Sequence, residues 1–304
     1  MKFLIIGDLH GRKPKIYYKK FDAIIAPGDF CSDKGIRPLK DAWMKALEKK
    51  ETDSGLDEFI IKKIGKSRYK KLEKESLKVG RKILEFLDSF NKPVFIVPGN
   101  WDQSYGTTKI KNINKNDYLY YKGFLDFWLG KRTNKFLVQG LKNIYDCQYQ
   151  LFIFPEFNII GYGLSSAPEY TKQRAKKFTV LQRRKYKKAY LRILQRLDLL
   201  YSKRDRNKPT IFLTHNVPYG TTLDQLINKK SSLHKKHFGS VVALKFCKKY
   251  KPLVCIGGHM HEHFSSCKIG ATTAINAGFG SFVNVWMELS GSRIKKLEFY
   301  RGRK

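Results

Sequence analysis

Side chains that bind metal ions recur at five places in the sequence, each time directly after a short apolar run. The set combines carboxylates, imidazoles and one amide, and it contains no thiolate. Such a mixture suits first-row divalent ions such as Mn, Fe, Ni or Zn, whereas Ca and Mg prefer shells of oxygen alone. The pattern therefore predicts a site for divalent metal ions. Its candidate residues are Asp8, His10, Asp29, Asn100, Asp102, His215, His259 and His261.

Two of the five places carry a pair of such side chains separated by one residue, Asp8 with His10 and His259 with His261. At the end of a strand or in a tight loop, residues two apart can point to the same side, so each pair can hold neighbouring ions. Either pair alone would often be a helix cap or a turn. The occurrence of all five places, each at the end of a strand-like run, favours the metal site.

The apolar runs before these residues have the composition of buried strands, because they are short, rich in β-branched and aromatic residues, and bounded by glycine or proline. Helical patterns lie between them, at 75–90, 175–201 and 240–250. Alternation of strand and helix predicts an α/β fold with a largely parallel sheet, which binds ligands beyond the carboxyl ends of its strands. We therefore expect the five places to converge on one side. The runs are residues 3–6, 23–26, 94–97, 210–213 and 253–256.

The 304-residue chain is strongly basic, with 61 lysines and arginines against 26 acidic residues and a formal net charge of +35. This charge favours polyanionic partners such as nucleic acid, but a compositional bias of the whole proteome would give the same excess. No apolar run approaches the roughly 20 residues that span a membrane. The five cysteines form no Cys-x-x-Cys pair, so a thiolate metal site is not indicated. We expect a cytoplasmic protein with reduced thiols and no membrane partner.

Five motifs make the chain resemble the calcineurin-like metallophosphoesterases over nearly its whole length. The resemblance implies a single α/β domain over residues 1–304, built as a four-layer sandwich of two mixed β-sheets flanked by helices. It also implies a cofactor of two divalent metal ions, with Mn as the first choice and Fe, Ni or Zn as alternatives. The motifs are Asp8-Leu9-His10, Gly28-Asp29, Gly99-Asn100-Trp101-Asp102, His215 and Gly258-His259-Met260-His261.

The resemblance also implies how the ligands divide between the two ions. Each ion would have four protein ligands and open positions for water and phosphate, and two such ions turn water into a nucleophile and hold phosphate oxygens for attack. Asp29 would bridge the ions, and Asp29, Asn100 and Asp102 belong to the predicted catalytic set. The remaining ligands are Asp8, His10 and His261 on one ion, and Asn100, His215 and His259 on the other.

Within the family, the chain is most similar to small cytoplasmic phosphodiesterases of archaea and bacteria, through segments 215–224 and 237–240 and the Gly-His-x-His-Glu sequence that follows. The similarity implies hydrolysis of phosphodiester bonds in a nucleotide or nucleic acid. The alternatives are a phosphomonoesterase, including a phosphoprotein phosphatase, and a catalytically weak scaffold that binds nucleic acid. Trp101 departs from the family pattern, because many members carry there a histidine that protonates the leaving oxygen. Its indole either stacks on a base of the substrate or walls the pocket.

Two stretches are longer than the minimal fold requires. Residues 31–82 are charged, and we expect a largely helical, solvated cap over the site. Residues 172–208 carry 15 lysines and arginines, and we expect a basic helix that either binds nucleic acid or is an ordinary solvated surface helix. The buried stripe predicted for this helix consists of Leu181, Tyr190, Leu191, Leu194, Leu197 and Leu200.

His237 precedes the predicted helix at 240–250 and completes the predicted catalytic set. We expect it to contact the substrate phosphate or leaving group, the alternative being a surface histidine. Ser240 is predicted to cap the helix, and its free backbone N–H groups, together with Gly239, are predicted to receive a phosphate oxygen. Beyond this helix, three segments are predicted as strands of a second sheet. They are residues 272–275, 282–289 and 295–300.

Overall fold

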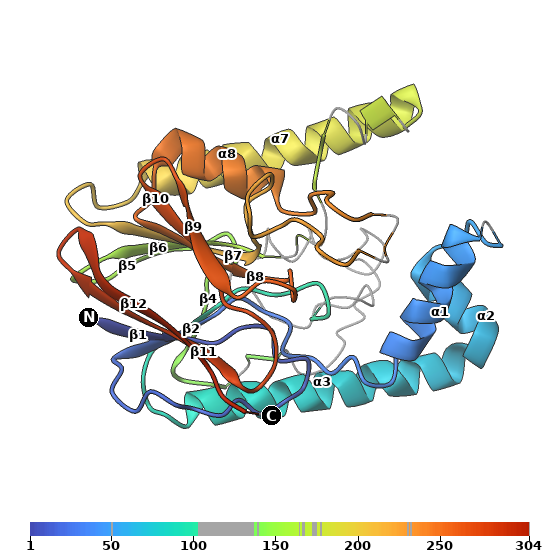
Figure 1. Ribbon diagram of the computed structural model, residues 1–304, viewed down its shortest axis with the longest axis horizontal. Helices are drawn as coiled ribbons and strands as arrows, with labels where there is room; N and C mark the ends of the chain where they lie inside the picture. Colours follow the sequence, from blue (N-terminus) through green and yellow to red (C-terminus); the bar gives the residue numbers. More distant parts are fainter. Residues whose placement is uncertain are drawn as a thin grey trace.

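Two mixed six-stranded β-sheets lie face to face in the computed structural model, and helices cover their outer sides (Figure 1). Helix α3 (Lys66–Asp88) covers the first sheet, while α7 (Val180–Ser202) and α8 (Val241–Tyr250) cover the second. The predicted α/β sandwich of two mixed sheets flanked by helices is confirmed. The structure describes residues 1–303 except 50, 103–136, 139, 164, 166–167, 172–174, 177, 230 and 232.

The first sheet has the strand order β12-β11-β1-β2-β3-β4. Strands β1 to β4 are parallel, and the antiparallel pair of β11 and β12 extends the sheet beyond β1. Every residue of β2 and β3 is buried, which explains their uninterrupted apolar sequence. The strands are β1 (Lys2–Ile5), β2 (Ala23–Ala26), β3 (Val94–Ile96), β4 (Ile144–Asp146), β11 (Val283–Ser290) and β12 (Arg293–Arg301).

The second sheet has the strand order β5-β6-β7-β8-β10-β9. Its four central strands are parallel, and β5 and β9 are antiparallel edge strands. The edge strand β9 is largely exposed, whereas β7 and β8 are buried throughout. The strands are β5 (Leu151–Ile153), β6 (Asn158–Tyr162), β7 (Thr210–Asn216), β8 (Val254–Gly258), β9 (Ser265–Ile269) and β10 (Thr272–Asn276).

The strands that precede the predicted metal residues belong to both sheets and not to a single one. Strands β1, β2 and β3 lie in the first sheet, and β7 and β8 in the second. The three C-terminal segments, predicted as strands of a second sheet, are also divided between the sheets. Strand β10 pairs with β8 in the second sheet, whereas β11 and β12 extend the first sheet from β1. Local sequence identifies a strand, but its neighbours are decided by packing between residues far apart in the chain.

Alternating side chains of the same strands supply the three apolar layers of the sandwich. Phe3 and Ile211 point between the sheets, where they meet side chains of the opposite sheet. Leu4 points outward and packs under α3, and Phe212 packs under α7 and α8. Both faces of the central strands are therefore buried, and this fixes the register that brings their ends together.

Helices α1 (Arg37–Glu48) and α2 (Leu56–Ile64) and the first half of α3 project beyond the sheets, on the right of Figure 1. We call these three segments the cap helices. They share a small apolar core with Trp101, a residue of the loop that follows β3. Through Trp101 the cap helices are attached to the end of the sheets at which the predicted metal residues lie.

Helix α7 begins with a capping box formed by Thr179 and Gln182, and only its second half packs on the sheet. The predicted buried stripe is wrong at Leu181 and Leu191, which are 78% and 44% exposed. The first half of α7 extends past the sheet (Figure 1), and the described residues leave these two side chains exposed. Neither α7 nor any other helix in the described part of the chain has a stretch long and apolar enough to cross a membrane.

Candidate metal centre

The ends of five strands bring the predicted metal residues together in two groups. Asp8, Asp29 and Asn100 follow β1, β2 and β3, His215 lies near the end of β7, and the two remaining histidines follow β8. Within each group, candidate ligand atoms lie within 4.8 Å of one another. The first group consists of Asp8, His10, Asp29 and His261, and the second contains Asp29, His215 and His259.

In the first group, ring nitrogens and carboxylate oxygens face a common point. His10 Nε2 lies 3.1 Å from His261 Nε2 and 3.3 Å from Asp29 Oδ2. The Nε2 atom of His261 also lies 3.3 Å from Asp8 Oδ2. Two unprotonated ring nitrogens that face each other repel at this distance, and a cation between them removes the repulsion.

The second group has the same character and shares one residue with the first. His215 Nε2 lies 3.2 Å from His259 Nδ1 and 2.9 Å from Asn100 Oδ1. Asp29 Oδ2, the oxygen that faces His10, is 3.5 Å from His215 Nε2. One carboxylate oxygen thus faces a nitrogen of each group, which is the position that a bridging ligand takes.

The two central carboxylates are poorly satisfied by the protein alone. Asp8 Oδ1 and Asp29 Oδ2 are buried and accept no hydrogen bond from any described residue. Burial raises the pKa of Asp8 from 3.8 to about 7 and holds the pKa of Asp29 well above its ordinary value. A buried carboxylate is stabilised when it coordinates a metal ion, so the residues present fit a pair of divalent cations.

The histidines of the first group are held in the neutral form that binds metal. Burial lowers the pKa of His10 and lowers that of His261 to about 3, with the positive charges of Arg37 and Lys40 contributing to the second shift. A neutral imidazole presents a lone pair, whereas a protonated ring has none on its nitrogens. Both rings are therefore ready to act as ligands near neutral pH.

Further contacts orient two of the ligand rings. His215 Nδ1 lies 2.8 Å from the carbonyl oxygen of Pro27, and because a carbonyl only accepts, Nδ1 carries the proton and Nε2 faces the site. His10 Nδ1 lies 3.2 Å from Asp33 Oδ2. Burial opposes ionisation of Asp33, but its hydrogen bond to His10 and the charge of Arg37 lower its pKa to about 2. Asp33 therefore stays charged and holds the His10 ring in place.

Three of the seven non-glycine residues with positive φ angles in the described part of the chain are candidate ligands. His10, Asp29 and His259 have positive φ angles of 46°, 57° and 64°, a conformation that non-glycine residues rarely adopt and that persists only where the surroundings enforce it. Glycine is required beside them, because a Cβ atom at Gly99 would overlap Asp29 Oδ1 and one at Gly258 would overlap Asp8 Oδ1. The glycines of the sequence motifs thus give the carboxylates their space.

Asp102 lies outside both groups, and its contacts are those of a positioning residue. It is completely buried. Its Oδ2 accepts hydrogen bonds from the backbone N–H groups of Asp29 and Gly99, each 2.8 Å away, and its Oδ1 accepts those of Phe30 and Cys31 at 3.0 Å. Both oxygens join the loops after β2 and β3, and these contacts favour a role in supporting Asp29. The catalytic role of Asp102 stays a prediction.

Trp101 forms a wall between the site and the cap helices. Its side chain is 4% exposed and packs with Ile36, Ile60 and Tyr69 of the cap helices and the turn before them. On the other side its ring contacts the His10 ring edge to face, with centroids 5.9 Å apart. Of the two predicted roles, the buried indole favours the wall over stacking on a substrate base.

His237 and the start of α8 are arranged differently from the prediction. Ser240 caps the helix as expected, but its side chain and the N–H groups of Val241 and Val242 are bound by the carboxylate of Glu169. The N–H of Gly239 donates to Asp224. The predicted phosphate position is therefore already filled by acidic side chains, a long-range contact that local sequence does not reveal.

His237 itself is held by Asp224. Its Nδ1 lies 2.7 Å from Asp224 Oδ1, and its ring meets Tyr219 edge to face. Asp224 is buried and also accepts the N–H groups of Gly220 and Thr221, so it fastens the loop that contains the predicted 215–224 segment. No contact recorded among the described residues joins His237 to the two metal-ligand groups, and its contact with substrate stays a prediction.

Three residues beside the site were missed in the sequence: Asp33, Arg37 and Lys40. Arg37 forms an ion pair with Asp33, and the charged groups of Arg37 and Lys40 lie 6.0 and 5.2 Å from the centre of the Trp101 ring. The spacing of four residues between Asp33 and Arg37 is that of a helical ion pair and could have indicated their contact. Nothing in the local sequence distinguishes Lys40 from other surface lysines.

Comparison with known proteins gives a consistent result for the fold. The profile of the family described as calcineurin-like phosphoesterase matches residues 1–263. The sequence matches no curated protein. One crystal structure is similar at a TM-score of 0.59 and 17% identity, covering 98% of both chains. Phosphopantetheinyl hydrolase from Mycobacterium tuberculosis is similar at a TM-score of 0.50 and 13% identity, covering 92% of this chain and 89% of its own. At such identities the structures show a shared fold.

Proposed function

Because the chain belongs to the calcineurin-like phosphoesterase family, whose members hydrolyse phosphoric esters, we propose that it cleaves phosphodiester bonds of a nucleotide or nucleic acid at a dinuclear metal centre. The observation that carries this proposal is the pair of ligand groups that share Asp29 Oδ2. Manganese is our first choice of metal, with Fe, Ni or Zn as alternatives, because the nitrogen and oxygen donors suit first-row ions.

The residues of the site have different roles in the proposed reaction. Two divalent ions bound there would generate a nucleophile from water and neutralise charge on the phosphate. Asp29 sets the spacing of the two groups, and Asn100 contributes an amide oxygen to the second group. The carbonyl of Pro27 keeps the His215 lone pair turned to the site. The buried Trp101 excludes water from the side of the cap helices.

The presence of tryptophan at position 101 favours a phosphodiester as the substrate. With indole at Trp101, no imidazole is present there to protonate a departing alkoxide, and a positioned acid is worth about 10²–10⁴-fold. An alkoxide leaving group, whether the serine oxygen of a phosphoprotein or a sugar oxygen, needs that proton, whereas a nucleotide that leaves through its phosphate oxygen does not. We therefore place phosphodiester hydrolysis before phosphomonoester or phosphoprotein hydrolysis.

The purified protein is expected to contain two divalent ions per chain and, with Mn, to hydrolyse bis-p-nitrophenyl phosphate faster than p-nitrophenyl phosphate. Metal analysis followed by parallel assays with Mn, Ni and Mg measures both quantities. Removal of the ions with a chelator should abolish both activities, and Mn should restore them. A faster reaction with the monoester would favour the phosphomonoesterase, and a metal-free, inactive protein would contradict the proposal.

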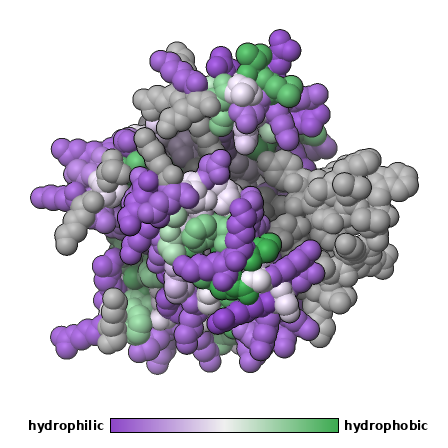
Figure 2. Space-filling model, turned by 90° about the vertical axis from the view of Figure 1, so that its right-hand side faces the viewer, coloured by the Kyte–Doolittle hydropathy of each residue, from purple (hydrophilic) through white to green (hydrophobic). Residues whose placement is uncertain are grey.

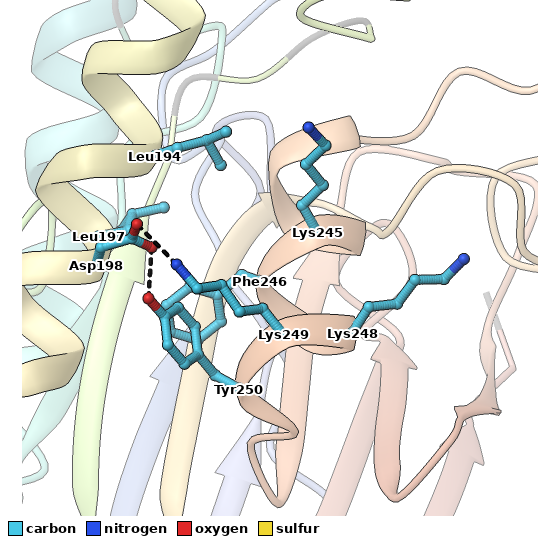
Figure 3. A pocket seen from close by; sticks show the side chains of 8 residues that line it. All are labelled: Leu194, Leu197, Asp198, Lys245, Phe246, Lys248, Lys249 and Tyr250. Carbon is cyan, nitrogen blue, oxygen red and sulfur yellow. Dashed lines mark hydrogen bonds and ion pairs between the residues drawn. The ribbon is translucent and has the colours of Figure 1, made fainter.

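The outer face of α7 and α8 supports a nucleic acid as the substrate or partner. A shallow hollow of about 410 Å³ on the exposed part of α7 is lined by four cations and the apolar Leu191. A groove of about 460 Å³ lies between α7 and α8, where Lys249 and Tyr250 turn toward Asp198 while Lys245 and Lys248 point away from it (Figure 3). The four cations of the hollow are Arg184, Lys187, Lys188 and Arg192.

Hydrophilic side chains predominate over the described part of the side of the molecule that Figure 2 shows. Lysine and arginine side chains that neutralise phosphates release counterions, which makes binding dependent on salt. We propose that single-stranded RNA or DNA binds along α7.

No disulfide joins the cysteines of the described residues, and this agrees with our proposal of a reducing, cytoplasmic location.

Replacing the four hollow-lining cations by glutamate is expected to weaken binding of single-stranded RNA at least tenfold and to reduce its salt dependence. A fluorescent oligonucleotide titrated at several salt concentrations measures both. The matched control replaces four exposed lysines of α3, Lys66, Lys70, Lys74 and Lys78, and changes the net charge by the same amount. Equal loss in both variants would mean that the total charge matters and α7 is no binding face.

A further inference from the structure

Two cationic side chains of helix α1, Arg37 and Lys40, lie beside Trp101 at the edge of the candidate metal centre. The guanidinium of Arg37 and the ammonium of Lys40 lie against the Trp101 ring, and this ring also contacts the metal-ligand candidate His10. The backbone N–H of Trp101 donates to Asp29 Oδ1 at 2.8 Å. Trp101 therefore connects the cap helices to two residues of the first group, His10 and the shared Asp29.

The two cations differ in their partners. Arg37 is paired with Asp33, which in turn faces His10 Nδ1. Lys40 is half-buried, and within the described part of the chain its ammonium lies over the Trp101 ring and forms no ion pair. Lysine is rarely withdrawn from water without a counter-charge, because desolvation of the ammonium is costly. Burial and the charge of Arg37 outweigh the attraction of the Asp29, Asp33 and Asp41 carboxylates there, so the position favours a further anion.

The Lys40 charge acts on the metal-ligand candidates and not only on Trp101. It interacts electrostatically with Asp29 and with His261, so the ammonium lies on the side of the first group. Once cations occupy the two groups, the carboxylates there are neutralised, and Asp33 is paired with Arg37. A bound anion then adds to the negative charge that faces Lys40. A substrate phosphate bound at the metal centre would supply this negative charge.

We propose that Lys40 binds a non-bridging oxygen of the substrate phosphate, and that Arg37 is a positioning residue that fixes α1 and Asp33 against the centre. The inference rests on the proposed function and adds a substrate contact supplied by the cap. The Trp101 indole is buried and offers no open face on which a base could stack. The cap therefore recognises the charge of the phosphate. The Lys40 ammonium lies 5.2 Å from the centre of the Trp101 ring, and its flexible stem allows it to reach the ligand.

The test compares Lys40→Met with Lys45→Met, a control on the same helix at an exposed position. Methionine keeps an apolar stem over Trp101 and removes the charge, and both variants lose one positive charge. Calorimetric titration of the manganese-loaded proteins with inorganic phosphate gives the affinity without relying on turnover, and kinetics give KM and kcat. Metal analysis of each variant shows whether the centre is intact.

A hydrogen bond to a charged group contributes about 1.5–3 kcal/mol, so Lys40→Met is expected to weaken phosphate binding about 10- to 100-fold. Both ions should remain, KM should rise at least as much as kcat falls, and Lys40→Arg should recover most of the affinity. Lys45→Met should behave like the parent.

Three results would overturn the inference: unchanged phosphate affinity in Lys40→Met, an equal loss in Lys45→Met, or a loss that follows depletion of the ions. An unchanged affinity excludes a contact between Lys40 and phosphate, and an equal loss in Lys45→Met means that only the overall charge matters. A loss that follows depletion of the ions means that Lys40 stabilises the metal centre. A parent protein that holds two ions and binds phosphate but cleaves no phosphate ester would refute the proposed function, and the phosphate affinities would still decide the role of Lys40.

Discussion

Replacing Asp29 by asparagine is expected to lower phosphoester hydrolysis at least about 10³-fold, the upper end of the loss seen when one electrostatic stabiliser of a transition state is removed. Asp29 is the one residue that both ligand groups share, so the change affects both ions at once. Asparagine keeps the Oδ1 atom that accepts the N–H of Trp101, and the loop should keep its shape. Metal analysis should find fewer than two ions per chain.

The same substitution is expected to have the opposite effect on the stability of the metal-free protein. Burial raises the pKa of Asp29 above its ordinary value of 3.8, so the unfolded chain ionises first and the metal-free fold loses stability as the pH rises from 3.8 through the folded pKa. Asparagine does not ionise. At pH 8 the metal-free Asp29→Asn protein should therefore unfold at a temperature equal to or above that of the metal-free parent.

Thermal unfolding with and without Mn, followed by circular dichroism, measures this reversal. With Mn the parent should be the more stable protein, because only the parent gains the full binding free energy of the ions. Asp22→Asn is the control, since Asp22 accepts a backbone N–H at the protein surface, far along the strand from the ligands. Full metal content and full activity in Asp29→Asn would refute the dinuclear assignment.

Much of the candidate centre was predictable because its residues follow local rules. Each ligand lies next to a short apolar run, and the carboxyl ends of parallel strands gather such residues. The glycines of the motifs also carried information, since Gly99 and Gly258 are required by the close approach of the two aspartates. Local sequence was therefore sufficient for the identity of the strands and for the side chains at their ends.

The features that escaped prediction depend on contacts between distant segments. The pairing of β11 with β1 joins residues more than 280 positions apart, such as Phe3 and Met287, and no local pattern encodes it. Glu169 reaches the start of α8 from a separate loop and fills the place that was expected to receive phosphate. Leu181 has the spacing of a buried residue but lies beyond the sheet that would cover it.

Replacing Asp102 by asparagine is expected to destabilise the fold by about 2–4 kcal/mol, the cost of leaving buried donors unpaired. Each carboxylate oxygen accepts two backbone N–H groups, Oδ2 those of Asp29 and Gly99 and Oδ1 those of Phe30 and Cys31. Asparagine has one acceptor oxygen, so either orientation of the amide leaves two N–H groups facing an NH₂. Denaturant unfolding of the parent and the variant measures the loss.

The activity of the Asp102→Asn protein separates a positioning role from a catalytic one. If Asp102 supports Asp29, metal affinity should fall about 10- to 100-fold, as for other residues that orient ligands, and high Mn concentrations should restore most of kcat. Asp224→Asn is the matched control, because Asp224 is equally buried and binds three backbone N–H groups in the loop after β7. That variant should lose stability and keep its metal affinity. A kcat that stays low at saturating Mn would place Asp102 in the catalytic set, since a lost proton donor or acceptor is not replaced by more metal.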